Sequence, residues 1–245
     1  MYCKYYGFPK KFFDVIYDPR FLYLTSDHQE PEQFPTQASS DRYQEVKTKL
    51  IACFPEKSIK TILITSATHG DGSSFTAVGF ATTLARDYGL EVLLVDANLR
   101  SPRLHEIFNI YYDQGLSNLL TKEEETTTSC IKKVGPGDLS VIPCGEKNSA
   151  PLTLFESIRF EKSLKIMREK FDYVILDAPP VNSYAESRVI AAKVDGVILV
   201  IGSGKTRRQV ALKAKQELEE AGAKVLGVIL NRRKHYIPEW LYQKL

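Results

Sequence analysis

Six short apolar runs follow residue 55, and longer amphipathic stretches separate them. The runs cover residues 60–66, 92–97, 139–142, 172–178, 195–201 and 224–230. Several are continuous rather than alternating, which is typical of strands buried on both faces of a parallel sheet. Helices are predicted between them, at about 75–87, 155–170, 184–193 and 206–221. This alternation predicts an α/β fold with a mostly parallel central sheet flanked by helices.

The first 53 residues have a different character. Residues 1–30 are rich in aromatic side chains, and residues 31–40 are polar and contain two prolines, which predicts a linker. A helix is predicted over 41–53, because Tyr43, Val46 and Leu50 recur at helical spacing. We therefore expect an N-terminal docking segment and linker over 1–40, and a main domain over 41–245.

Composition narrows the class of protein. A chain of 245 residues suits one large α/β domain, and a net charge of +3 gives no case for nucleic acid as the main partner. The four cysteines are scattered and contain no CxxC pair, so free thiols in a reducing cytosol are expected. With no signal peptide and no apolar stretch of about 20 residues, we expect a cytoplasmic protein that reaches membranes only by recruitment.

The first strand leads into SATHGDGSSF (66–75) and then a helix. Glycines allow a tight turn whose N–H groups face a phosphate, and the helix presents its positive end to the same anion. The order strand, glycine-rich loop and helix predicts a P-loop NTPase. The expected nucleotide-binding residues are His69, Gly70, Asp71, Gly72, Ser73, Ser74 and Phe75.

One residue of this loop departs from the pattern. Ser73 occupies the position of the lysine that serves the β- and γ-phosphates. Loss of one such stabilising donor typically costs about 2.7–4 kcal/mol in the transition state. We expect phosphate binding to survive in weakened form and phosphoryl transfer to suffer more.

Two acidic residues end later strands. Asp96 closes VLLVD and Asp177 closes YVILD, so both are expected at the sheet edge where ligands bind in open α/β folds. Either one alone is equally compatible with a helix cap. Together with the loop they predict a site for ATP and Mg²⁺, in which Asp96 and Asp177 are catalytic and Ser74, Asp96 and Asp177 bind the metal.

The segment GSGKT (202–206) also follows a strand and contains a lysine. It lacks the glycine that a P-loop requires six positions before that lysine, so it is interpreted as a turn that enters a helix. A subordinate hypothesis is that Lys205 reaches the nucleotide from across the site, and that Lys205→Ala weakens ATP binding.

The motifs SATHGDGSS, LLVDANLRSPRLHEIF and VILDAPPV resemble those of the bacterial P-loop protein tyrosine kinases, which share a fold with MinD/ParA ATPases. The resemblance covers about residues 41–231. It implies ATP and Mg²⁺ as cofactors, tyrosine phosphorylation, a role in capsule or exopolysaccharide biosynthesis and export, and a membrane polysaccharide co-polymerase that regulates chain length as partner. It also implies a homo-oligomer and recruitment to the inner face of the membrane.

Besides Ser73, three features depart from that family. Asn98 replaces an aspartate, and the ring-forming helix carries Asp41, Gln44 and Lys47 in place of its E-x-x-R-x-x-R pattern. The C-terminus offers only Tyr236 and Tyr242 as phosphoacceptors. These departures favour a weak kinase or pseudokinase over a vigorous autokinase.

Two other functions stay open. One is a non-catalytic regulatory module that binds the co-polymerase, which Ser73 and Asn98 favour. The other is a MinD/ParA-like ATPase, against which the residues 67–69 argue, because that group carries an additional lysine early in its loop.

Both ends of the chain carry further hypotheses. Residues 1–30 resemble the opening segment of general-secretion-type AAA ATPases, at positions that include Tyr6, Gly7 and the run 18–24. They are interpreted either as a docking segment or as a cover for an apolar patch of the same chain. The basic, aromatic stretch 232–245 either contacts a membrane or partner, or packs on its own domain.

Overall fold

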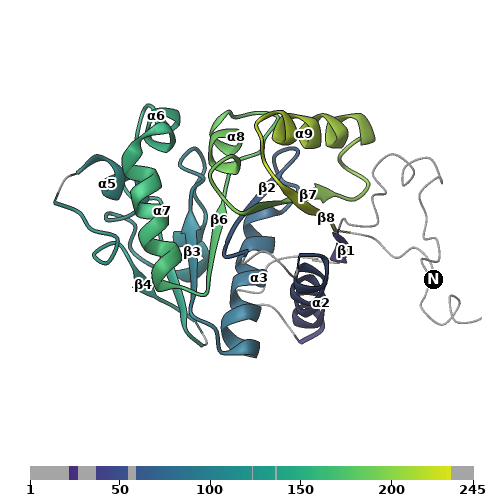
Figure 1. Ribbon diagram of the computed structural model, residues 1–245, viewed down its shortest axis with the longest axis horizontal. Coiled ribbons are helices and arrows are strands. Elements are labelled where there is room, and N and C mark those ends of the chain that lie inside the picture. The colour runs from purple at the N-terminus through teal and green to yellow at the C-terminus, as the bar shows by residue number, and fades with distance from the viewer. Residues whose placement is uncertain (1–21, 27–36, 55–58, 123, 136, 233–245) are drawn as a thin grey trace, which may run out of the picture.

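A computed structural model of the chain describes residues 22–26, 37–54, 59–122, 124–135 and 137–232. Its centre is an eight-stranded sheet in the order β1-β8-β7-β2-β6-β3-β5-β4 (Figure 1). All neighbouring strands are parallel except β4, which pairs antiparallel with β5. The strands are β1 Leu22–Ser26, β2 Thr61–Ser66, β3 Val92–Asp96, β4 Lys132–Lys133, β5 Leu139–Ile142, β6 Tyr173–Asp177, β7 Gly196–Gly202 and β8 Val225–Asn231.

The six predicted strands are confirmed, with ends that differ by one residue or less. Residues of β2, β3, β5 and β7 are buried throughout, as continuous apolar runs require. Two strands were not predicted, β1 and β4, and both lie at an edge of the sheet. Edge strands need little apolar character because only one side pairs, so their sequences carry a weak signal.

Helices cover both faces of the sheet. α2 and α3 lie on one face, whereas α6, α7, α8 and α9 lie on the other (Figure 1). Each face has its own apolar core, the first around Phe80 and Leu84 of α3 and the second around Phe155 and Phe160. The helices are α2 Gln37–Cys53, α3 Ser73–Tyr88, α4 Leu104–Phe108, α5 Leu116–Thr121, α6 Pro151–Glu156, α7 Ile158–Lys170, α8 Glu186–Ala191 and α9 Arg208–Glu220.

The linker prediction was wrong for residues 37–40, because α2 already begins at Gln37. The two prolines of the segment precede this point, and the polar residues that follow them are compatible with a helix start. A boundary at residue 40 therefore falls inside α2. The described part of the N-terminal segment also joins the sheet, since β1 pairs with β8. The rest of residues 1–36 lies outside the described residues.

α2 packs closely on α3 through a single glycine. A Cβ atom on Gly79 would lie 2.3 Å from the ring of Tyr43, a distance that no side chain tolerates. Tyr43 is buried, as predicted, together with Val46 and Leu50. Gln44 Nε2 donates to Asp87 Oδ2 at 3.0 Å, and the ammonium of Lys47 lies over the Tyr88 ring. Two of the three side chains considered for ring assembly thus contact α3 of their own chain.

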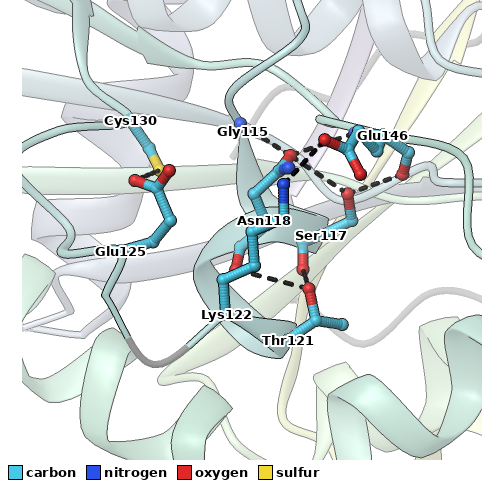
Figure 2. A network of polar contacts seen from close by, with 8 residues as sticks. All are labelled: Gly115, Ser117, Asn118, Thr121, Lys122, Glu125, Cys130 and Glu146. Carbon is cyan, nitrogen blue, oxygen red and sulfur yellow. Dashed lines mark hydrogen bonds and ion pairs between the residues drawn. The ribbon is translucent and has the colours of Figure 1, made fainter.

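A buried amide fixes the loop after β5 (Figure 2). Asn118 Oδ1 accepts hydrogen bonds from the N–H groups of Gly115, at 3.2 Å, and Glu146, at 3.0 Å. The Ser117 hydroxyl donates to the Glu146 carbonyl at 2.6 Å. Gly115 approaches the backbone so closely that an added Cβ would meet the Pro143 carbonyl at 2.3 Å. This network holds Cys144 and its neighbours in place beside the edge of the sheet where β3 ends.

A carboxylate ties the starts of β2 and β7 together. Asp195 Oδ2 accepts the Lys60 and Thr61 N–H groups at 3.0 and 2.9 Å and the Thr61 hydroxyl at 2.9 Å, while Arg168 pairs with Oδ1. Partial burial opposes ionisation of Asp195, yet these hydrogen bonds outweigh it, and the pKa of Asp195 is lowered. The charged form is therefore the one that stabilises the folded chain.

We expect Asp195→Asn to lower the free energy of unfolding by roughly 1–2 kcal/mol at pH 7, because it loses charge-assisted hydrogen bonds. A lowered pKa in the folded state stabilises above the unfolded value, near 4, and this contribution disappears as pH falls through the folded pKa. Urea unfolding at pH 7 and at successively lower pH measures the difference between variant and wild type. Asp138→Asn, at an exposed position, is the control. A difference that does not shrink below about pH 4 would contradict the assignment.

Candidate functional site

The carboxyl ends of five parallel strands meet at one edge of the sheet. β2 leads there into the loop 67–72, and β7 leads into the turn 203–206. β3, β6 and β8 end there at Asp96, Asp177 and Asn231. In open α/β sheets this edge is where ligands bind.

The loop 67–72 has the shape of an anion cradle. Gly70 and Gly72 adopt φ values of 75° and 95°, which favour glycine, and α3 begins directly after them. The N–H groups of Gly70, Gly72, Ser73 and Ser74 have no hydrogen-bond partner among the described residues. Unpaired donors at a helix N-terminus suit a phosphate. Of the residues predicted to bind nucleotide, 69–72 lie in this loop and 73–75 lie in the first turn of α3.

Asp71 lies in the same loop but plays a structural part. It is fully buried, and its carboxylate accepts hydrogen bonds from the Thr68 N–H at 3.0 Å, the Thr68 hydroxyl at 3.1 Å and the Thr206 hydroxyl at 2.7 Å. These bonds join the loop after β2 to the turn after β7. The Asp71 carboxylate is therefore already hydrogen-bonded to protein donors.

Asn231 completes the support of the loop. Its Nδ2 donates to the Asp71 carbonyl at 2.8 Å, and a Cβ on Gly72 would lie 2.0 Å from that nitrogen. Gly72 is therefore required both by its backbone angle and by this close approach. Asn231 was not predicted as a site residue, although it is a polar residue at the end of an apolar strand, VLGVILN. Thr206 was predicted only as part of the turn 202–206.

Ser73, at the position where the P-loop pattern has lysine, lies in the first turn of α3. Ser73 is 9% exposed and carries no charge toward the loop. Ser74 follows it, half-buried, and its hydroxyl lies near the Asp177 carboxylate. Phe75 is half-buried in the same turn.

Asp96 and Asp177 are register partners on β3 and β6, and both are fully buried. Their surroundings differ. Asp96 accepts the N–H groups of Asn98, Arg103 and Leu104 at 3.3, 3.2 and 3.0 Å, so it also fixes the loop that leads into α4. Neither carboxylate oxygen of Asp177 has a hydrogen-bond partner among the described residues.

The electrostatics follow from this arrangement. Burial raises the pKa of Asp96, and its three backbone hydrogen bonds oppose the rise. Burial also raises the pKa of Asp177, and the neighbouring Asp96 adds to it, whereas the Ser74 hydroxyl works against it. Two buried acids without a described salt bridge repel each other, so a cation would be favourable between them. The pair and Ser74 fit Mg²⁺, which prefers oxygen ligands.

A second group flanks the loop. Both Arg100 Nε and Nη2 donate to Glu186 Oε1, at 2.9 and 2.7 Å, and Glu186 is buried. The Tyr184 ring lies edge-on to His69 of the phosphate loop and also near the Arg100 guanidinium. Asn98 instead folds back locally, and its Oδ1 accepts the Ser101 N–H at 3.1 Å.

Comparisons with known proteins agree with this geometry. The family model described as an AAA domain matches residues 59–203. Tyrosine-protein kinase YwqD of Bacillus subtilis is 32% identical over 200 residues, which cover 82% of this chain and 84% of YwqD. The chain belongs to the bacterial tyrosine-protein kinase family. This confirms the resemblance drawn from the motifs. CpsD of Streptococcus agalactiae, also a tyrosine-protein kinase, is 33% identical over 180 residues, covering 73% of this chain and 78% of CpsD.

Solved structures share the fold of this kinase-family chain. The chimeric protein CapA2B2 has a TM-score of 0.77 at 27% identity and covers 86% of this chain and 93% of its own. The kinase domain of the Escherichia coli tyrosine kinase ETK has a TM-score of 0.81 at 22% identity, covering 95% and 98%. MinD from Pyrococcus horikoshii, solved with Mg-ADP, has a TM-score of 0.60 at 20% identity and covers 76% of each chain. They confirm a P-loop NTPase fold of the MinD/ParA type.

Other predictions of this kinase-family chain fall outside the described residues. These are the phosphoacceptors Tyr236 and Tyr242, the segment 1–30 that resembles AAA ATPases, apart from residues 22–26, and the basic tail, apart from Arg232. They stay predictions. Among the described residues, no helix has both the length and the apolar character needed to cross a membrane.

We expect Asp177→Asn to raise the melting temperature in metal-free buffer, by an amount equivalent to roughly 1–3 kcal/mol. The change removes one of two adjacent buried acids. The same variant should lose the rise in melting temperature that excess Mg²⁺ causes in the wild type. Thermal unfolding with EDTA and with Mg²⁺ tests both effects, and Asp113→Asn, an exposed acid, is the matched control. A variant that melts below the wild type in EDTA would show that Asp177 already has a stabilising partner.

Proposed function

We propose that the chain binds ATP with Mg²⁺ and is a tyrosine-kinase-like protein of exopolysaccharide or capsule biosynthesis and export, in which phosphotransfer is weakened. The observation that carries this proposal is the uncharged Ser73 in the first turn of α3, in a loop that otherwise keeps its free N–H donors. Binding depends on those donors, whereas transfer depends more strongly on the missing charge.

The roles of the site residues follow from their contacts. The N–H groups of 70–74 would hold the phosphates. Ser74, Asp177 and Asp96 would hold Mg²⁺, and Asp177 is the strongest candidate because the Ser74 hydroxyl, itself a proposed ligand, is the one described donor near its oxygens. When bound, Mg²⁺ would neutralise charge on the β- and γ-phosphates. Asp96 would contribute less, since three backbone N–H groups already engage it.

The setting is proposed from the family. Relatives named as tyrosine-protein kinases support a kinase-like activity on protein tyrosines. We propose a membrane polysaccharide co-polymerase as partner, with peripheral recruitment to the inner face of the membrane. Residues 1–30 would act as a docking segment, part of which, β1, also joins the sheet of the main domain. Tyr236 and Tyr242 would be the phosphoacceptors.

Calorimetric titration of ATP and ADP, with and without Mg²⁺, tests the proposal on wild type and Ser73→Lys. The wild type is expected to bind, and Ser73→Lys should bind ATP roughly ten- to a hundredfold more tightly because a charge-assisted contact is restored. Ser73→Lys should also gain tyrosine phosphorylation, detected with an anti-phosphotyrosine antibody after incubation with ATP and Mg²⁺.

Ser73→Met is the matched control, since its side chain is long but uncharged, and it should not gain affinity. Binding that improves in Ser73→Lys without any phosphotyrosine would favour the regulatory, non-catalytic module. Absence of binding in both wild type and Ser73→Lys would refute nucleotide binding and leave the loop as a structural feature.

A further inference from the structure

We propose that Lys205, on the turn between β7 and α9, supplies to the nucleotide phosphates the positive charge that Ser73 does not. This rests on the proposed nucleotide binding and adds to it a phosphate-binding residue outside the P-loop. The turn 202–206 is too short to wrap a phosphate by itself. Its lysine would therefore act on phosphates held by the loop 67–72 and the start of α3.

The ammonium group lies directly on the phosphate loop. Lys205 Nζ donates a hydrogen bond to the backbone carbonyl of His69. A Cβ on Gly70 would lie 2.6 Å from the same nitrogen. Lys205 Nζ is therefore adjacent to the glycine that opens the turn 70–74, where every N–H group except that of Asp71 lacks a partner among the described residues. A side chain at Gly70 would displace the ammonium, so the glycine also makes room for it.

The backbone that carries Lys205 is fixed relative to the loop. The Thr206 hydroxyl donates to Asp71 Oδ1 at 2.7 Å and lies 3.2 Å from the Thr68 hydroxyl. The Gly202 carbonyl accepts the N–H groups of Lys205 and Thr206 at 3.2 and 3.0 Å, which closes the turn. Gly202 itself has no room for a side chain, since a Cβ would lie 2.8 Å from Asp71 Oδ1.

Asp71 thus joins the loop after β2 to the turn that carries Lys205. Its buried carboxylate anchors the turn through Thr206, and Asn231 holds its carbonyl from the next strand. The Ser203 N–H donates to the Asn231 carbonyl at 2.8 Å, which attaches the start of the turn to β8 as well. Several hydrogen bonds therefore fix the backbone of the turn from which the Lys205 side chain extends.

Lys205 retains the capacity to bind an anion. Its side chain is exposed, it uses one of three N–H donors on His69, and within the described ranges it forms no salt bridge. Arg100, near the Tyr184 ring that contacts His69, is committed to Glu186. A compact ammonium on a four-carbon stem can leave a neutral carbonyl for a phosphate, because bonds between charged groups are the stronger ones.

The test is a double-mutant cycle on ATP binding in the presence of Mg²⁺, with wild type, Lys205→Ala, Ser73→Lys and the double variant. Lys205→Ala should weaken binding roughly ten- to a hundredfold in the wild-type background. In the Ser73→Lys background the same change should cost about threefold or less, because the P-loop lysine then serves the phosphates. Lys205→Arg should keep most of the affinity.

Further variants distinguish a direct effect of the Lys205 charge on the phosphates from a loss of folding and from a general change in net charge. Arg207→Ala removes an exposed charge two positions along and should bind as the wild type does. Lys205→Met preserves the length of the side chain without its charge and should behave as Lys205→Ala. Melting temperatures without nucleotide should match the wild type in each variant.

The outcomes are distinct. An equal loss in both backgrounds would overturn the proposal, because Lys205 would then act only by holding the His69 carbonyl. Unchanged affinity of Lys205→Ala in a wild type that binds ATP would overturn it too, while leaving nucleotide binding intact. A wild type that binds no ATP would overturn nucleotide binding and the role of Lys205 together.

Discussion

The site is built around two buried carboxylates on adjacent strands. The parallel register places Asp96 beside Asp177 at the carboxyl edge of the sheet, with no salt bridge to either in the described ranges. Such a pair is unfavourable unless hydrogen bonds, protons or a cation compensate for it. Asp96 is compensated by the loop 98–104, which explains why this loop is ordered around it. The Asp177 carboxylate has no such backbone donors, so it is available to a bound cation.

The phosphate loop depends on a different balance, between free and engaged polar groups. The N–H groups of Gly70 and Gly72 have no partner among the described residues, whereas the Asp71 carboxylate is buried and accepts hydrogen bonds from the protein. The loop can therefore contain Asp71 and still attract an anion. Since α3 begins with an uncharged residue, we attribute the proposed attraction to backbone dipoles and to a cation on another segment.

The sequence predicted those parts of the fold that local pattern determines. Continuous apolar runs marked the six inner strands, and the spacing of glycines marked the loop. The partners of the loop could not be read in this way. Thr206 and Asn231 contact Asp71 across 135 and 160 residues of chain, and no local pattern at either position points to Asp71 as its partner. Short edge strands and the short helices α4 and α5 were missed because so few residues carry too little periodicity. The differing roles of Asp96 and Asp177 also required coordinates, since both end similar strands.

The position of β8 has a mechanical consequence. On one side this strand pairs with β1 through five residue pairs, from Leu22↔Gly227 to Ser26↔Asn231, and its last residue secures the phosphate loop. A force applied to the chain before Leu22 would pass through one strand and one side-chain amide before it reached the loop. The described part of the N-terminal segment is thus coupled to the loop 67–72 through the hydrogen bonds between β1 and β8 and through Asn231. A partner that binds the N-terminal segment would therefore also restrain this loop.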